Sequence, residues 1–369
     1  ILFWRTFMDD AKLFTPGPLT THREVRAAMN RDLGSRDDDF VRLTRRVRQS
    51  LLDLYDLNDD YAAVLLPGSG TYAVEAVLGL VHGKVLIVNN GAYGARMTQI
   101  AQSLRIPYVE MVYDETVAPN PAEVQRMILK YGSITHLAFV HCETTTGMFN
   151  PFDELAALGR EHGVCVVVDV MSSFGAVDFK ADTADFLIFS SNKCLEGPPG
   201  LAVVLARKSW LESAVGRGFS LNLAAQWKYM EHTGQFRFTP PVQIVCALDS
   251  ALNRLQAEGG VKRRAERYIQ NYLTLLYEMR RMGFRELLDS RLQGYIITSF
   301  RFPEHPVFDF DVFYRMLKER GKIIYPGKVS GAESFRIGHI GDLYPSDMRE
   351  LARAIEDALA QMGVALPLC

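Results

Sequence analysis

Two stretches, VCVVVD at residues 164–169 and FLIFSSNKC at residues 186–194, decide the fold. Each begins with a short apolar run rich in β-branched or aromatic residues, which is typical of a strand buried on both faces of a parallel sheet. Each run is followed by a side chain that can carry charge, Asp169 in the first and Lys193 in the second. Open α/β sheets bind ligands at the carboxyl ends of their strands. Both residues are therefore candidates for one site.

Similar runs recur between residues 61 and 205 and alternate with helix-like segments. The expected strands are Ala63–Leu66, Val85–Val88, His136–His141, Val164–Val168, Phe186–Phe189 and Leu201–Leu205, and the expected helices include Thr71–Leu80 and Pro121–Tyr131. This alternation predicts βαβ units and an α/β fold, with a mostly parallel sheet covered by helices on both faces.

The pattern changes after a helix-like stretch at Ile244–Glu258. The elements expected beyond it are a strand at Tyr295–Phe302, a helix at Asp309–Arg320, short strands at Ile323–Tyr325 and Ser334–Ile337, and a helix at Pro345–Met362. We therefore expect an N-terminal extension over residues 1–14, a large domain over residues 15–260 and a smaller α+β domain over residues 261–369. Ile1–Phe7 has no small-residue cleavage site, so we interpret it as a leftover or upstream extension rather than a signal peptide.

Composition excludes several classes of protein. With 41 basic and 43 acidic side chains, the 369-residue chain lacks the basic surface that nucleic-acid backbones require. No apolar run approaches the roughly 20 residues that cross a bilayer, so we expect no membrane partner. The cysteines form neither a CxxC pair nor a Cys/His zinc spacing, which favours reduced thiols in a cytoplasmic protein without a metal site. They are Cys142, Cys165, Cys194, Cys246 and Cys369.

The stretch LLPGSGTYAVEA at residues 65–76 offers a candidate phosphate site. Gly70 lets the backbone approach a ligand closely, and the free N–H groups of a first helical turn attract an anion. Ser69 and Thr71 add hydroxyl donors. The stretch is neither a Walker loop nor a GxGxxG motif, and a plain strand-to-helix turn with a Ser/Thr cap explains it equally well in isolation.

Asp169 and Lys193 also have ordinary explanations when taken singly, because the first could cap the segment after its strand and most lysines are simply solvated. Together with the phosphate cradle, however, they match the needs of pyridoxal phosphate: a lysine for its aldehyde, an acid for its pyridine nitrogen and an anion site. Tyr93 lies between two glycines, on a loop after the strand Val85–Val88, and could lie flat against the ring. Core packing is the alternative for this tyrosine.

The sequence resembles the class V aminotransferases of fold type I, and within them the branch that acts on 2-aminoethylphosphonate and pyruvate. The resemblance runs from about residue 13 to residue 359. It rests on these segments, in order: TPGPLTT (15–21), DDD (37–39), GSGTYAVEAVLG (68–79), NGAYGARM (90–97), HCETTTGM (141–148), DVMSSFG (169–175), SSNKC (190–194), FTPP (238–241), IYPGKVS (324–330) and FRIGHIG (335–341).

This resemblance implies a homodimer with shared active sites that binds pyridoxal 5'-phosphate covalently at Lys193. Asp169 would pair with the pyridine nitrogen and Tyr93 would stack on the ring. The other cofactor contacts would come from Ser69, Gly70, Thr71, Thr144 and Asn192, together with Thr239 reaching the phosphate of the neighbouring subunit. The substrate anion would be bound by Arg336 with Pro16 and Gly17. The implied reaction moves the amino group of 2-aminoethylphosphonate to pyruvate by a ping-pong mechanism, giving phosphonoacetaldehyde and L-alanine.

Four alternatives compete with this interpretation. An alanine– or serine–glyoxylate transaminase would share the scaffold and nearly every cofactor residue. A cysteine desulfurase would place a histidine where Tyr93 stands and would need a mobile cysteine, whereas Cys194 directly follows Lys193. A nicotinamide dehydrogenase would need a GxGxxG with an acidic residue about 20 positions later. A binding module gives no reason for Asp169 and Lys193 to flank one site.

Overall fold

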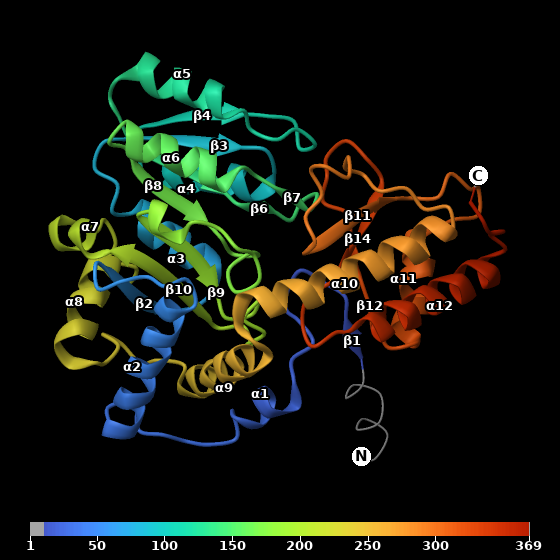
Figure 1. Cartoon of the computed structure of the whole chain (residues 1–369), viewed down its shortest axis with the longest axis horizontal. Helices are drawn as coiled ribbons and strands as arrows, with labels where there is room; N and C mark the ends of the chain where they lie inside the picture. The colour runs from blue at the N-terminus through green and yellow to red at the C-terminus, as the bar shows by residue number, and fades with distance from the viewer. Residues whose placement is uncertain (1–10, 369) are drawn as a thin grey trace.

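The computed structural model describes residues 11–368, so the predictions made for Ile1–Phe7 and for Cys369 lie outside the described residues. A seven-stranded sheet with the strand order β2-β10-β9-β8-β5-β3-β4 forms the larger part of the molecule (Figure 1). Its strands are β2 (Tyr61–Pro67), β3 (Lys84–Asn89), β4 (Tyr108–Val112), β5 (Ile134–Val140), β8 (Cys165–Asp169), β9 (Phe186–Ser190) and β10 (Leu201–Arg207).

The sheet is parallel except at β10, which runs antiparallel to both of its neighbours. The predicted α/β fold with a mostly parallel sheet is therefore confirmed, and each of the predicted strands is present. β4 was not predicted; it is an edge strand whose residues are half-buried apart from the exposed Val112.

Helices cover both faces of this sheet. The helices of the larger part are α1 (Arg23–Ala27), α2 (Asp38–Asp53), α3 (Gly70–Leu78), α4 (Ala92–Ser103), α5 (Pro121–Tyr131), α6 (Phe152–Glu161), α7 (Lys208–Ser213), α8 (Leu223–Thr233) and α9 (Val242–Glu258). Right-handed crossovers place α3 and α4 on one face, since the chain then moves toward β4, and place α5 and α6 on the other, since it then moves back (Figure 1). The carboxyl ends of β8 and β9 consequently meet at one edge.

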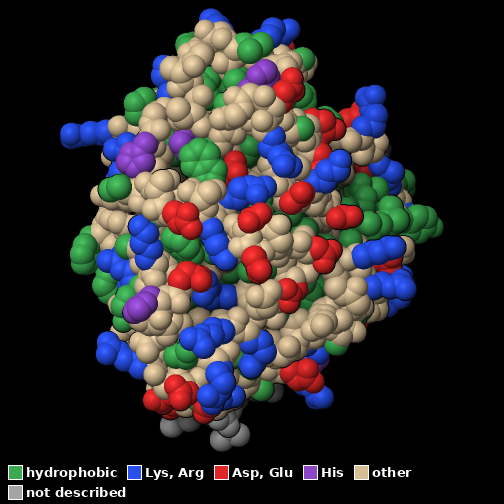
Figure 2. All heavy atoms as spheres, turned by 60° about the vertical axis from the view of Figure 1, so that its left-hand side comes forward, with side chains coloured by type: hydrophobic (Ala, Val, Ile, Leu, Met, Phe, Trp, Pro, Cys, Tyr) green, Lys and Arg blue, Asp and Glu red, His purple; other side chains and the backbone are tan. Residues whose placement is uncertain are grey.

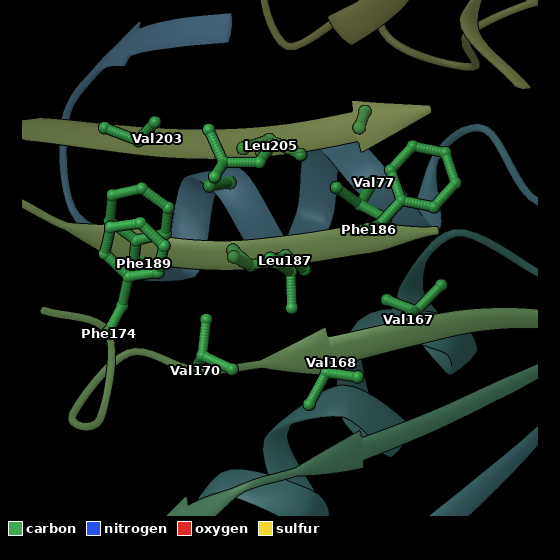
Figure 3. Close-up of a cluster of buried hydrophobic side chains, with 14 of the residues drawn as sticks. Val77, Val167, Val168, Val170, Phe174, Phe186, Leu187, Phe189, Val203 and Leu205 are labelled. Atoms are coloured by element: carbon green, nitrogen blue, oxygen red, sulfur yellow. The ribbon is translucent and has the colours of Figure 1, made fainter. Parts of the chain in front are cut away.

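The core at this edge is densely packed. The rings of Phe174 and Phe189 stack with centroids 3.6 Å apart and planes 7° apart, beside Leu187, Val170 and Val203 (Figure 3). All five side chains are buried. Residue 174 follows the end of β8 and residue 189 lies near the end of β9, so their contact fixes the two segments that carry Asp169 and Lys193.

The smaller, C-terminal domain has a hydrophobic core of its own. Its elements are α10 (Gly260–Arg281), β11 (Ile297–Arg301), α11 (Phe310–Glu319), β12 (Lys322–Ile323), β13 (Tyr325–Pro326), β14 (Ser334–Gly338) and α12 (Pro345–Met362). An antiparallel sheet of order β11-β14-β13 packs against these helices. The domain boundaries at residues 14 and 260 stay predictions, although Phe14 packs in this second core.

One element of this domain differs from the prediction. The single strand expected at Ile323–Tyr325 is two short strands, because β12 pairs with β1 (Lys12–Leu13) while β13 pairs with β14. Ile324, between them, is fully buried. The chain changes pairing partner at this residue.

The described residues 11–368 contain no helix that is both long and apolar enough to cross a membrane. On the face shown in Figure 2, basic and acidic side chains are interspersed rather than gathered by sign. The four cysteines within this range are buried and form no disulfide.

Candidate active site

A cavity of about 530 Å³ opens at the carboxyl ends of β8 and β9. Within one chain it brings together seven of the predicted site residues: Ser69, Gly70, Thr71, Tyr93, Asp169, Asn192 and Lys193. These residues come from loops and helix ends that are far apart in the sequence, so their convergence is a property of the fold. Pro16, Gly17, Thr144 and Arg336 lie around this group, as described below, and Thr239 does not join it.

Asp169 ends β8 and is buried. Its Oδ1 accepts a hydrogen bond from the backbone N–H of Met171 at 2.8 Å. Burial raises the pKa of this carboxyl to about 7, and the negative charge of Glu143 adds to the effect of burial. In the described part of the chain no cation forms an ion pair with it. A buried carboxylate that lines a cavity without such a partner suits a positively charged ligand atom.

Lys193 follows β9, and its Nζ donates a hydrogen bond to the backbone carbonyl of Pro16 at 2.6 Å. Burial lowers the pKa of the ammonium group, which favours the neutral amine that can attack an aldehyde. Gly17 adopts φ +118°, and a Cβ there would lie 2.6 Å from Lys193 Cδ. The Pro16-Gly17 turn therefore packs directly against the lysine, at a position that only glycine can occupy.

The loop that carries Lys193 is anchored to the smaller domain through Glu196. Glu196 adopts a left-handed φ of 60°, and its Oε1 accepts hydrogen bonds from Arg267 Nη2 at 2.7 Å and from the Tyr268 hydroxyl at 2.5 Å. Arg267 Nη1 also donates to the carbonyl of Gly341 at 2.6 Å, shortly after the strand that carries Arg336. This network joins the lysine loop to the small domain.

The phosphate cradle lies at the N-terminus of α3. Ser69 is the N-cap residue, but its side chain makes no capping hydrogen bond, so its hydroxyl and the first N–H groups of the helix remain available to an anion. Arg96 Nη1 donates to Thr71 Oγ1 at 3.3 Å and lines the same cavity. This donor set fits the phosphate of pyridoxal phosphate, just as the buried lysine and carboxylate fit its aldehyde and its ring nitrogen.

Tyr93 lies in the first turn of α4, not on a loop as the sequence analysis expected. Gly94 suggested a loop, but it lies inside the helix. A glycine is needed at this position because a Cβ there would lie 2.8 Å from the Asn89 Cα. Burial alone would raise the pKa of Tyr93, but the positive charges of Lys193, Lys328 and Arg336 and a hydrogen bond with the Thr144 side chain bring its net pKa down. The ring stands at the cavity wall, among cations.

Arg336, on β14, is buried at 7% exposure. Its Nε donates to the carbonyl of Pro326 at 3.0 Å and its Nη1 to the carbonyl of Thr144 at 2.9 Å. Burial lowers the pKa of the guanidinium. Asp342, an acidic residue close to Arg336 in the sequence, forms no ion pair with it and accepts instead a hydrogen bond from the Tyr344 hydroxyl at 3.4 Å. The backbone contacts therefore hold Arg336 toward the large domain without neutralising its charge.

Two predicted threonines occupy different positions. Thr144 is buried between Arg336 and Tyr93, in the hairpin that joins β6 (Cys142–Glu143) and β7 (Met148–Phe149). Thr239 is exposed and does not line the cavity of its own chain. Its expected contact with a neighbouring subunit stays a prediction.

The sequence analysis missed Arg96, Glu143 and Lys328. Glu143 is fully buried, and its carboxylate accepts hydrogen bonds from the N–H groups of Tyr93 and Gly94 at 3.2 and 3.4 Å. All three lie within motifs already quoted: Glu143 in HCETTTGM, Arg96 in NGAYGARM and Lys328 in IYPGKVS. Only their position next to Tyr93 in space distinguishes them from ordinary solvated charges.

A larger hollow of about 990 Å³ lies elsewhere, among residues of α1, α2 and α9. Oppositely charged side chains line it, including the pair Arg46 and Asp249, whose atoms approach to 2.8 Å. It contains none of the predicted site residues. Within residues 11–368 no cluster of three or more His, Cys, Asp or Glu side chains is placed to hold a metal ion.

Comparison with known proteins agrees with this fold. The family model described as "Aminotransferase class-V" matches residues 20–330. The chain belongs to this family of aminotransferases. A 2-aminoethylphosphonate–pyruvate transaminase of Klebsiella pneumoniae subsp. pneumoniae is 47% identical over 356 residues, which cover 94% of this chain and 97% of the relative.

Two solved structures show the same fold at lower sequence identity. Pyridoxamine–pyruvate aminotransferase from Mesorhizobium loti superposes with a TM-score of 0.88 at 24% identity, covering 97% of this chain and 94% of that one. An alanine–glyoxylate aminotransferase from Nostoc sp. also gives a TM-score of 0.88 at 24% identity, covering 95% of both chains. At this identity the likeness is one of fold.

Proposed function

We propose that the protein transfers the amino group of 2-aminoethylphosphonate to pyruvate, giving phosphonoacetaldehyde and L-alanine. The observation that carries this proposal is the 47% identity, over 94% of the chain, to a transaminase named for that reaction. The convergence of Lys193, Asp169 and the phosphate cradle on one cavity supports it. One of the two solved structures compared above is an aminotransferase that acts, by its name, on alanine and glyoxylate, and that reaction is the alternative to exclude.

Pyridoxal 5'-phosphate is the proposed cofactor, and when bound it supplies a protonated pyridine ring that accepts electrons from the reacting carbon. Lys193 would hold its aldehyde, Asp169 its ring nitrogen, and Tyr93 its ring face. Ser69, Gly70 and Thr71, with Asn192, would hold its phosphate. All of these residues line the same cavity, the one at the carboxyl ends of β8 and β9.

Lys193 carries the proton transfers in this proposal. Its Nζ takes a proton from the carbon next to the substrate nitrogen and later returns a proton, so one residue serves as base and as acid. The burial that lowers its pKa makes the neutral, proton-accepting form more abundant. Asp169 keeps the opposite end of the site negative, and this matters most for a substrate whose reacting carbon carries no carboxylate.

Arg336 is the proposed anion site, with the Pro16-Gly17 turn beside it. Its planar guanidinium suits two-point contact with a phosphonate or a carboxylate. In a ping-pong cycle the phosphonate leaves with the aldehyde before pyruvate enters, so one arginine serves both substrates in turn. Its two backbone contacts fix its orientation beforehand.

The proposal includes a cytoplasmic homodimer with shared active sites. Thr239 is exposed in the single chain, which suits a residue that reaches the cofactor phosphate of its neighbour. The four described cysteines are buried and free of disulfides, which suits a reducing compartment.

A donor panel tests the reaction. The yellow purified enzyme is mixed in turn with 2-aminoethylphosphonate, alanine and serine, and the loss of the yellow band is followed. We expect 2-aminoethylphosphonate to bleach the band fastest. Alanine should bleach it too, because it is the amino donor of the reverse reaction. Rapid bleaching by serine or alanine, with glyoxylate rather than pyruvate restoring the colour, would instead favour the alternative. Borohydride reduction and peptide mapping should find the cofactor on Lys193 and on no other lysine.

A further inference from the structure

Lys328 is a cation beside Tyr93 that has no part in the reaction proposed above. It lies in the segment between β13 and β14, and its Nζ is 4.4 Å from the centroid of the Tyr93 ring. The side chain is exposed, and in the described part of the chain it forms no ion pair. A cation–π contact at an exposed position is worth only about 0.5–1 kcal/mol. The ammonium group is therefore free to move to an anion.

The segment that carries Lys328 is held in place from the large domain. Ser330 donates from its backbone N–H and from its hydroxyl to Glu115 Oε2, at 2.8 and 3.0 Å. Glu115 follows β4, so this clasp links the two domains. It fixes the backbone two residues beyond Lys328 and does not involve the lysine side chain.

Charge gives this lysine a role that Arg336 cannot fill alone. Arg336 carries one positive charge, which matches the single negative charge of a carboxylate such as pyruvate. A phosphonate resembles a phosphate group, which carries about −1.5 to −2 near pH 7. Lys328 Nζ lies over the Tyr93 ring. Arg336 donates to the carbonyl of Thr144, whose side chain forms a hydrogen bond with Tyr93, so both cations border the same tyrosine.

We propose that Lys328 is a substrate-binding residue that supplies the second positive charge for the phosphonate dianion and so selects phosphonate over carboxylate ligands. This inference rests on the proposed function, because it assigns the phosphonate of that reaction to two cations from the small domain. The Glu115–Ser330 clasp is the positioning element that holds the lysine segment against α4.

Lys328→Met tests the proposal, since it keeps an unbranched side chain and removes the charge. The control is Lys318→Met, at an exposed lysine on α11. Binding of methylphosphonate and of acetate to the cofactor-loaded enzyme is measured by calorimetry at pH 6 and pH 8. We expect Lys328→Met to weaken methylphosphonate roughly tenfold at pH 8, in the lower range for a lost charge-assisted contact because the site is partly exposed. Acetate binding should change less than twofold.

Kinetics give a second readout. Lys328→Met should lower kcat/KM for 2-aminoethylphosphonate by a similar factor and leave kcat/KM for pyruvate unchanged, and Glu115→Gln should do the same to a smaller extent. Equal losses for methylphosphonate and acetate, or no loss for either, would overturn the proposal. If wild-type enzyme does not turn over 2-aminoethylphosphonate, the proposed function fails, while the methylphosphonate titration still decides whether Lys328 binds a dianion.

Discussion

At the scale of single residues, burial shifts the pKa values of the two central groups in the direction that favours the uncharged form of each. It raises the pKa of Asp169 to about 7 and lowers that of Lys193. For the lysine this favours the nucleophilic amine. For the aspartate it means that the chain buries a carboxylate without a cationic partner, and the protonated nitrogen of a bound ring would provide one.

Asp169→Asn should therefore change how stability depends on pH. Between the unfolded value of 3.8 and the folded value of about 7, the folded state binds more protons at this residue, so the free energy of unfolding falls as pH rises. Removing the carboxylate removes that fall, which amounts to about 4 kcal/mol at most. Urea midpoints of cofactor-free wild type, Asp169→Asn and the exposed control Asp311→Asn at pH 5 and pH 8 test this.

From pH 5 to pH 8 the urea midpoint of Asp169→Asn should rise relative to that of wild type. The midpoint of Asp311→Asn should change with pH as that of wild type does. Asp169→Asn should also slow single-turnover deamination at least tenfold, which corresponds to about 1.4 kcal/mol. If its midpoints change with pH as those of wild type do and deamination stays within about threefold of wild type, Asp169 is only a cap for the segment after β8.

Arg336→Lys should weaken both half-reactions, because an ammonium cannot reproduce two-point contact with an anion. We expect a loss of roughly 1.5–3 kcal/mol in kcat/KM for 2-aminoethylphosphonate and for pyruvate alike. For an amine donor without an acidic group, Arg336→Lys should lower kcat/KM far less. A loss confined to pyruvate would mean that the phosphonate has a different anchor.

At the scale of elements, α4 controls the position of the ring-facing tyrosine. Its N-terminus is bound by Glu143, whose Oε2 accepts from the first-turn N–H groups while its Oε1 accepts from the N–H and the hydroxyl of Thr145 at 3.1 and 2.6 Å. Negative charge at a helix N-terminus is favourable. The buried carboxylate thus ties the β6–β7 hairpin to the helix that carries Tyr93.

Glu143→Gln should loosen this connection, because one of its two oxygens becomes an amide donor that faces N–H or O–H donors. We expect the free energy of unfolding to fall by about 1–3 kcal/mol, the cost of leaving buried donors unpaired, and the affinity for pyridoxal phosphate to fall with it. The exposed Glu154→Gln on α6 is the matched control. Unchanged thermal stability and cofactor affinity in Glu143→Gln would show that the hairpin positions α4 without this carboxylate.

The elements also show what the sequence could predict. Apolar runs such as Val164–Val168 and Phe186–Phe189 mark buried strands, because both faces of each strand lie in the core. The edge strand β4 has no such run. Gly94 hid α4, because the close approach of this glycine to Asn89 at the end of β3 is visible only in the structure. Motif residues such as Asp169 and Lys193 could be predicted. Lys328 also stands in a quoted motif, IYPGKVS, but its position beside Tyr93 depends on a fold that brings the small domain there, so its role could not be predicted.

At the scale of the whole molecule, the candidate site draws on two domains, each with a hydrophobic core of its own. The large domain supplies Lys193 and Asp169, and the small domain supplies Arg336 and Lys328. α10 follows α9 directly and carries Arg267, whose contacts reach the lysine loop and the turn after β14 (Figure 1). Thr239 is exposed in the single chain, and its expected contact is with the cofactor phosphate of a neighbouring subunit.

Shared active sites predict complementation between two inactive variants. Lys193→Ala and Thr239→Asp should each be nearly inactive, the second because its charge repels the cofactor phosphate of the neighbour. In a hybrid dimer one site has both native residues, so unfolding and refolding an equal mixture should restore about a quarter of wild-type activity if subunits pair at random. No recovery in a mixture that refolds to dimers would contradict shared sites.

The central claim, that this chain deaminates 2-aminoethylphosphonate in a ping-pong cycle, is tested most directly by phosphorus NMR of a single turnover. Enzyme loaded with pyridoxal phosphate is mixed with excess 2-aminoethylphosphonate in the absence of pyruvate. We predict phosphonoacetaldehyde in an amount equal to the active sites, and further aldehyde, matched by alanine, only after pyruvate is added. Absence of the aldehyde from a yellow enzyme that converts alanine and glyoxylate would contradict the account.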